Sequence, residues 1–80
     1  MRSIEPKTMW RHFKGKYYLI EEVAQDCNTL EFIIVYRALY GDNTVWVRPL
    51  KDFLELVEPN RTDNVTGQMH RFERAFLIEK

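Results

Sequence analysis

The sequence contains little cysteine, glycine or proline. These low counts limit the classes of protein to which the chain can belong. A single cysteine, Cys27, excludes a disulfide within the chain. Only three glycines and three prolines occur among 80 residues, whereas 45% of the residues are hydrophobic and 14% are aromatic. Aromatic side chains bury a large apolar area each, so this composition indicates a globular rather than a disordered chain.

The chain also has no net charge, because 12 Lys and Arg residues balance 12 Asp and Glu residues. It therefore lacks the overall attraction to phosphate that non-specific nucleic-acid binding needs. The charges are unevenly spread, with five basic and one acidic residue in 1–17 and four acidic and no basic residues in 18–31. Two interpretations stay open, namely solvated strand faces and a basic patch that attracts an anion.

No hydrophobic run reaches the length of a membrane span, and the first residues contain no apolar core of a signal peptide. We therefore expect a cytoplasmic protein without a membrane partner. No internal repeat divides the chain, which we expect to form a single small domain over residues 1–80.

The turns and the alternation of apolar residues predict mainly β-structure. Residues 16–24 are strand-like in composition, although both faces carry apolar side chains. Residues 30–40 alternate most clearly, and their length predicts a bulge or bend within the strand. Turns are predicted at residues 26–29 and 41–44, followed by a returning strand at 45–48 and a last short strand at 70–72, with the end of the chain helical or frayed. One face of residues 30–40 carries no charge and is made of Leu30, Phe32, Ile34, Tyr36, Ala38 and Tyr40.

A helical stripe follows Pro49, since Leu50, Phe53, Leu54 and Val57 recur at helical spacing. The expected fold is a small SH3-like, partly open barrel or a strongly bent antiparallel sheet of about five strands, with one short helical turn after Pro49. Within it we expect an irregular lead-in at 1–9, a core at 10–57, a polar loop at 58–68, and a final strand and tail at 69–80.

Three blocks of the sequence resemble the domain-of-unknown-function 1653 family of small bacterial proteins. They are WRHFKG at residues 10–15, VYRALYG at 35–41 and WVRPL at 46–50, and an Arg71-Phe72 pair follows. Residues 25–29 depart from the resemblance because they replace a glycine-bearing turn, and Met69-His70 stands where a proline is common. The resemblance implies a compact β-rich domain and brings no activity with it.

The hairpin between residues 36 and 48 carries the predicted ligand site. If it turns at Asp42 and Asn43, Trp46 lies near Leu39 and Arg48 lies near Arg37. Two neighbouring arginines repel each other unless a carboxylate or a bound anion separates them. They could therefore bind an anion or a nucleotide-like ligand, or they could be surface residues paired with Glu21, Glu22 or Glu55. The predicted ligand-binding residues are Tyr36, Arg37, Tyr40, Trp46 and Arg48.

A second predicted patch is basic and aromatic and comprises Arg11, His12, Phe13 and Lys14. The alternative for Phe13, together with Trp10, is a core plug. The spacing of His12, Cys27 and His70 fits no zinc pattern, so neither a metal site nor a cofactor is predicted. No residue is predicted to be catalytic.

The function that we expect from the sequence is a non-enzymatic binding module that uses the aromatic and arginine face of the hairpin. Its partner would be a protein or peptide, or a nucleic acid. One alternative is binding of a nucleic acid or nucleotide by the basic N-terminal region with Arg37 and Arg48. Another is a small enzyme with His12 as the acid or base on an anionic substrate. An enzyme should have a concave pocket where His12 and Arg48 converge, whereas a module should have a shallow groove or flat patch.

Overall fold

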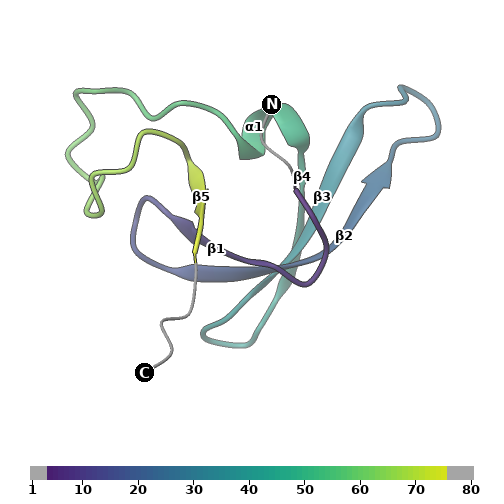
Figure 1. Cartoon of the computed structure of the whole chain (residues 1–80), viewed down its shortest axis with the longest axis horizontal. Coiled ribbons are helices and arrows are strands. Elements are labelled where there is room, and N and C mark those ends of the chain that lie inside the picture. Colours follow the sequence, from purple (N-terminus) through teal and green to yellow (C-terminus); the bar gives the residue numbers. More distant parts are fainter. Residues whose placement is uncertain (1–3, 76–80) are drawn as a thin grey trace.

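The structure, a computed structural model, describes residues 4–75, which form five β-strands and one short helix (Figure 1). In chain order these elements are β1 (Met9–His12), β2 (Tyr17–Gln25), β3 (Phe32–Ala38), β4 (Val45–Pro49), α1 (Leu50–Phe53) and β5 (Phe72–Arg74). The predicted last strand at 70–72 therefore begins two residues later, and the expected helical or frayed end falls partly outside the described residues. In the described part of the chain, no helix is long and apolar enough to cross a membrane.

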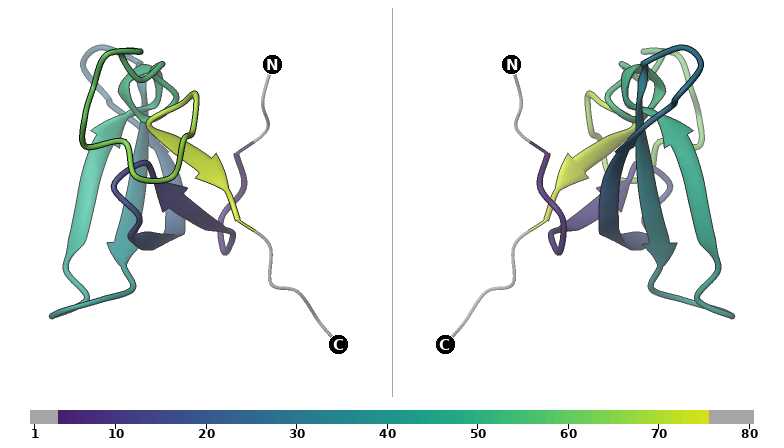
Figure 2. Two further views of the ribbon diagram at one scale, coloured as in Figure 1. Left: turned by 90° about the vertical axis from the view of Figure 1, so that its left-hand side faces the viewer. Right: turned by 90° about the vertical axis from the view of Figure 1, so that its right-hand side faces the viewer.

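All five strands belong to one antiparallel sheet with the order β4-β3-β2-β1-β5. The sheet stays open because its end strands, β4 and β5, do not pair with each other. Figure 2 shows the bend of the sheet, with β1 and β5 running obliquely to β3 and β4. The mainly β prediction is confirmed in the form of a bent, partly open sheet.

The turn before β3 forms through side-chain hydrogen bonds, as its composition predicts. The Asp26 carboxylate accepts hydrogen bonds from the main-chain N–H groups of Asn28 (2.8 Å) and Thr29 (3.2 Å). Leu30 then adopts a φ of 66°, which is incompatible with an extended strand. For this reason β3 begins at Phe32 and not at residue 30.

The predicted irregularity occurs on the partner strand. The pairing of β2 with β3 shifts between Ile20 and Glu22, so Glu21 is an extra residue in β2, and β3 runs without interruption. Ile34, Tyr36 and Ala38 of β3 are buried, which defines the inner face of the sheet. Beyond them, the predicted uncharged face becomes exposed at its two ends.

Helix α1 has only four residues and buries Phe53. The predicted helical stripe continues to Val57, but Leu56 instead forms an isolated β-bridge with His70, and the Val57 N–H donates to the Met69 carbonyl (2.8 Å). The chain after α1 is therefore extended, and it pairs with the residues just before β5. The short helical turn is confirmed, and its extension to residue 57 is wrong.

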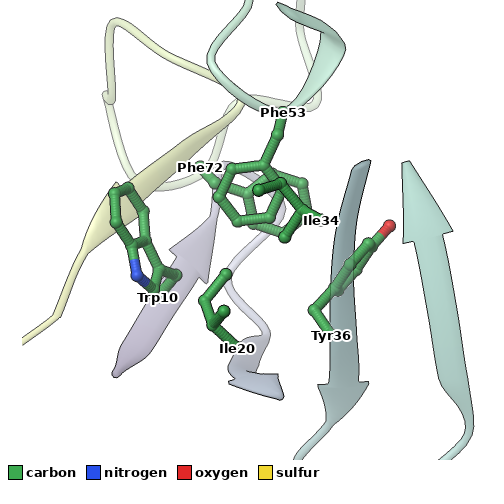
Figure 3. Close-up of a cluster of buried hydrophobic side chains, with 6 residues drawn as sticks. All are labelled: Trp10, Ile20, Ile34, Tyr36, Phe53 and Phe72. Atoms are coloured by element: carbon green, nitrogen blue, oxygen red, sulfur yellow. The ribbon is translucent and has the colours of Figure 1, made fainter. Parts of the chain in front are cut away.

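The hydrophobic core lies on the inner face, between the sheet and α1 (Figure 3). The rings of Phe53 and Phe72 stack with their centroids 4.2 Å apart, and Trp10 meets Phe53 edge-on at 5.4 Å. The Trp10 indole N–H donates to the Thr8 hydroxyl (2.9 Å), which satisfies its polar atom within the core. The buried cluster consists of Trp10, Ile20, Ile34, Tyr36, Phe53 and Phe72.

Candidate functional site

The register between β3 and β4 decides which residues of the hairpin share a face. Trp46 pairs with Tyr36, and Arg48 pairs with Ile34. Cross-strand partners project to the same side of a sheet, so Trp46 and Arg48 lie on the inner face beside the core. There they border a concave site at the rim of the core.

We call this site the aromatic hollow, a cavity of about 200 Å³ that is lined by residues of all five strands and of the hairpin loop. Its walls combine aromatic rings, an imidazole and a guanidinium group. The lining residues are His12, Tyr18, Tyr36, Tyr40, Trp46, Arg48 and Phe72. A volume of this size suits one side chain or one planar ring rather than a large cofactor.

Three tyrosines form one wall of the hollow. The Tyr18 and Tyr40 hydroxyls are hydrogen-bonded to each other (2.6 Å), and the Tyr18 ring meets the rings of Tyr36 and Tyr40 edge-on, with centroids 5.4 and 5.6 Å apart. Burial, followed by the hydrogen bond with Tyr40, raises the pKa of the Tyr18 phenol. The phenol therefore stays protonated at neutral pH and offers a hydrogen-bonding group rather than a charge.

Arg48 is the charged group of the hollow, and it is half-buried. Its Nε–H donates to the Tyr36 hydroxyl (3.2 Å), which fixes the direction of the guanidinium group. Among residues 4–75, no carboxylate forms a salt bridge with Arg48. The pKa of the Glu55 carboxyl is lowered by its hydrogen bond with Arg71 and, to a smaller extent, by the charge of Arg48.

His12 packs beside Tyr18 as an uncharged ring, with the two ring centroids 6.3 Å apart. It stacks on Phe13 (4.3 Å between centroids) and meets Phe72 edge-on (4.9 Å). Its Nδ1 accepts the main-chain N–H of Lys14 (3.1 Å), which places the proton of the neutral ring on Nε2.

The pKa of His12 is lowered from 6.5 to about 4. Burial is the largest cause, and the charges of Arg71 and Lys14 come next. Arg48 and Arg61 act in the same direction. The surroundings of His12 are thus electropositive, although the chain as a whole carries no net charge.

Arg37 does not lie beside Arg48, so the predicted pairing of the two arginines is wrong. Arg37 pairs with Val45 and projects from the outer face, where its Nε–H donates to the Glu21 carboxylate (2.7 Å). The loop from residue 39 to 44 is longer than a two-residue turn, and Asn43 holds it with a φ of 56° and a hydrogen bond to the Ala38 carbonyl (2.9 Å). Because of this longer loop, Arg37 pairs with Val45 and not, as predicted, with a residue near Arg48.

The four residues of the second predicted patch are also separated by the fold. Arg11 projects from the outer face, where its guanidinium group lies 5.5 Å from the centre of the Tyr17 ring. Phe13 is only 2% exposed, in agreement with a core plug. Lys14 forms a salt bridge with Asp63 (3.7 Å), so only His12 of the four lines the aromatic hollow.

Sequence reasoning missed two lining residues, Tyr18 and Phe72. Tyr18 belongs to a segment with apolar residues on both faces, so alternation alone could not orient it. Phe72 belongs to the Arg-Phe pair of the family resemblance, which is the one signal that pointed to it. Both residues reach the hollow because β2 and β5 flank β1.

Two other features bear on where a ligand could bind. A larger groove of about 730 Å³ lies at the outer face near Arg11 and Tyr17, and it borders Ala75, the last described residue. The aromatic hollow differs from this groove because it contains Arg48, which forms no salt bridge among residues 4–75. Among residues 4–75, no group of three or more His, Cys, Asp and Glu side chains could hold a metal ion.

A family model and a crystal structure are similar to this chain. A family model described as a protein of unknown function, DUF1653, matches residues 8–74, which include all three sequence blocks. A crystal structure of a DUF1653 protein from Bordetella bronchiseptica is similar, with a TM-score of 0.73 and 27% sequence identity over 100% of this chain and 97% of that chain. No curated protein matches the chain.

Proposed function

Given that the chain belongs to the DUF1653 family, we propose that it is a non-enzymatic binding module whose site is the aromatic hollow on the 36–48 hairpin. The observation that carries the proposal is Arg48, a half-buried guanidinium group without a salt bridge among the described residues. A cation in partly apolar surroundings is stabilised by an anionic partner. The ligand therefore places a negatively charged group on Arg48, and the surrounding rings contact the atoms next to that group.

The geometry supports two kinds of contact with such a ligand. The Nε of Arg48 is used by Tyr36, which leaves the other guanidinium N–H groups to bind carboxylate or phosphate oxygens. Trp46 is 52% exposed at the rim of the hollow, so its ring can stack on a planar ligand group. The Nε2–H of His12 supplies a further donor.

The enzyme alternative is favoured by one observation, since His12 and Arg48 line the same concave site. However, the Nδ1 of His12 already accepts the Lys14 N–H, and a ring with a pKa of about 4 is a weak base at neutral pH. We therefore assign His12 a binding role. The alternative of nucleic-acid binding through the basic N-terminal region has less support, because Arg37 and Arg11 lie on the outer face, away from Arg48.

The test is a titration with phenyl phosphate, a small probe that combines a ring with an anion, followed by nuclear magnetic resonance (NMR). The chain has two tryptophans. The Trp46 indole signal should shift, whereas the signal of Trp10, buried in the core, serves as an internal control.

Arg48→Gln should weaken binding about tenfold or more, because a charge-assisted hydrogen bond is lost. Arg37→Gln is the matched control and should leave binding unchanged, since Arg37 projects from the outer face. Equal losses in the two variants, or a probe that leaves Trp46 unaffected at millimolar concentration, would contradict the proposal.

A cytoplasmic location stays a prediction, which cell fractionation would test.

A further inference from the structure

Strand β4 is an end strand of the sheet, and its main chain is open on one side. Within residues 4–75 it pairs only with β3, and Figure 2 shows it along one side of the sheet. The Ala38 N–H donates to the Thr44 carbonyl (2.9 Å), and bonded positions alternate along an antiparallel pair. The main-chain groups of Trp46 and Arg48 therefore face β3, whereas those of Val45 and Val47 point away from the sheet.

The protection of this edge against pairing with another strand is confined to its last two residues, Arg48 and Pro49. Natural edge strands are typically short, charged, interrupted by proline or covered. In β4, Val45, Trp46 and Val47 are 42%, 52% and 66% exposed, and Pro49 interrupts the strand only at its far end. By contrast β5, the other end strand, has three residues, two of them charged.

The open edge adjoins the aromatic hollow, because Trp46 and Arg48 belong to both. Side chains of an added strand would alternate between the two faces of the sheet. Those opposite Trp46 and Arg48 would lie over the hollow, and those opposite Val45 and Val47 would cover exposed valines on the outer face. A partner segment should thus be apolar on one face.

Charge decides the chemistry of the other face. Arg48 has no salt bridge in the described part of the chain, and the pKa of the nearby His12 is lowered partly by surrounding cations. A segment with an acidic side chain opposite Arg48 would provide the missing counter-ion. A second copy of this chain would instead bring another uncompensated Arg48 to the edge, so charge complementarity favours an acidic partner.

We infer that the partner of the aromatic hollow is an extended acidic peptide segment that adds to β4 as a further strand, with Asp or Glu toward Arg48 and apolar residues toward Val45 and Val47. This inference rests on the proposed function, and it adds the class of ligand and the way in which it binds. Main-chain hydrogen bonds to Val45 and Val47 would supply affinity, and the alternating side chains would supply specificity.

The test uses blocked peptides about seven residues long, the length of an ordinary strand. The first alternates valine and glutamate, the second alternates valine and glutamine, and the third has the composition of the first with its glutamates grouped together. A fourth is the first peptide with N-methyl groups on the amides that would pair with β4. Affinity is measured by calorimetry, and the amide signals of Val45 and Val47 are followed by NMR.

The alternating valine–glutamate peptide should shift the amide signals of Val45 and Val47. Its affinity should be about tenfold higher, or more, than that of each of the other three peptides. Val47→Pro should weaken it similarly, because this change removes an N–H that points away from β3. If Val47→Pro fails to fold, the N-methylated peptide still tests the same hydrogen bonds from the partner's side.

Several outcomes would overturn the inference. If the grouped peptide binds as tightly as the alternating valine–glutamate peptide, the attraction comes from charge alone. If the glutamine peptide binds as tightly, Arg48 does not contribute to binding. Preferential binding of a single-stranded oligonucleotide, or a dimer formed through β4 in sedimentation, would identify a different occupant. If phenyl phosphate binds at Trp46 but no peptide does, the inference fails and the proposed function survives; if neither binds, both fail.

Discussion

Arg37 and Arg48 belong to neighbouring strands of one hairpin, yet their surroundings differ completely. Arg37 is on the outer face, where it binds the Glu21 carboxylate at 2.7 Å and also donates to the Asn43 carbonyl (3.1 Å). Arg48 is on the inner face, where it bonds to the Tyr36 hydroxyl and has no salt bridge among the described residues. The outer arginine is paired with a carboxylate within the fold, whereas the inner one is not paired with any described carboxylate.

This difference shows how a chain without net charge can hold a local cationic site. The bulge at Glu21 places a carboxylate beside Arg37, which neutralises the outer face of the hairpin. On the inner face, aromatic residues surround Arg48, and no carboxylate among residues 4–75 forms a salt bridge with it. The two faces should therefore respond differently to matched substitutions.

The largest expected effect separates the faces by stability. Phe72→Ala removes a ring that stacks on Phe53 and forms part of the floor of the hollow, so it should lower the free energy of unfolding by about 3–5 kcal/mol. Val47→Ala, on the exposed outer face, should cost at most about 1 kcal/mol. Urea unfolding followed by circular dichroism checks both values, and similar losses would refute the assignment of the two faces.

A smaller effect concerns pH. The pKa of His12 is about 4 in the folded protein and 6.5 as an ordinary histidine, so on acidification the unfolded chain takes up the proton first. Stability should therefore fall between these two pKa values, and the solvent-screened loss from about pH 7 to about pH 5 should be on the order of 1 kcal/mol.

Carboxylates also titrate in this range, so the measurement compares the wild type with His12→Asn, which keeps an acceptor for the Lys14 N–H. The wild type should lose more stability than the variant on acidification. Identical pH profiles would mean that His12 is not held neutral by its surroundings.

The smallest effect compares two adjacent tyrosines. Tyr18→Phe removes the hydrogen bond to Tyr40 on the inner face and should cost about 1 kcal/mol. Tyr17→Phe keeps the ring beneath Arg11 on the outer face and should change stability by less than about 0.5 kcal/mol. Thermal unfolding of the two variants under one condition ranks them, and the reverse ranking would contradict the role of the tyrosine wall.

Local chemistry predicted those parts of the fold that depend on neighbouring residues. The turn at residues 26–29 follows from the Asp26 side chain, and the buried face of β3 follows from the alternation of Ile34 and Tyr36. The helix was predicted to run too far, because helical spacing cannot reveal that Leu56 bridges to His70. This pairing links residues that are distant in sequence.

The candidate site was predictable only in part, for a related reason. Tyr36, Tyr40, Trp46 and Arg48 do line one hollow, as the aromatic content of the hairpin indicated. Whether Arg37 joins them depends on the register, which a change of one residue in the loop would invert. Tyr18 and Phe72 arrive from other strands through the strand order, which no local pattern specifies.

The pairing of β1 with β5 has a consequence for how the hollow comes into existence. Trp10 pairs with Arg74, and His12 pairs with Phe72, so residues near the two ends of the described chain must meet. Closing such a long loop costs entropy that later contacts must offset, which makes this step slow compared with formation of the β3–β4 hairpin. Until it occurs, Arg48 and Trp46 face an incomplete wall. During this interval the main-chain edge of β4 is exposed while the hollow is incomplete, so the folding chain is most prone to pair β4 with the wrong strand.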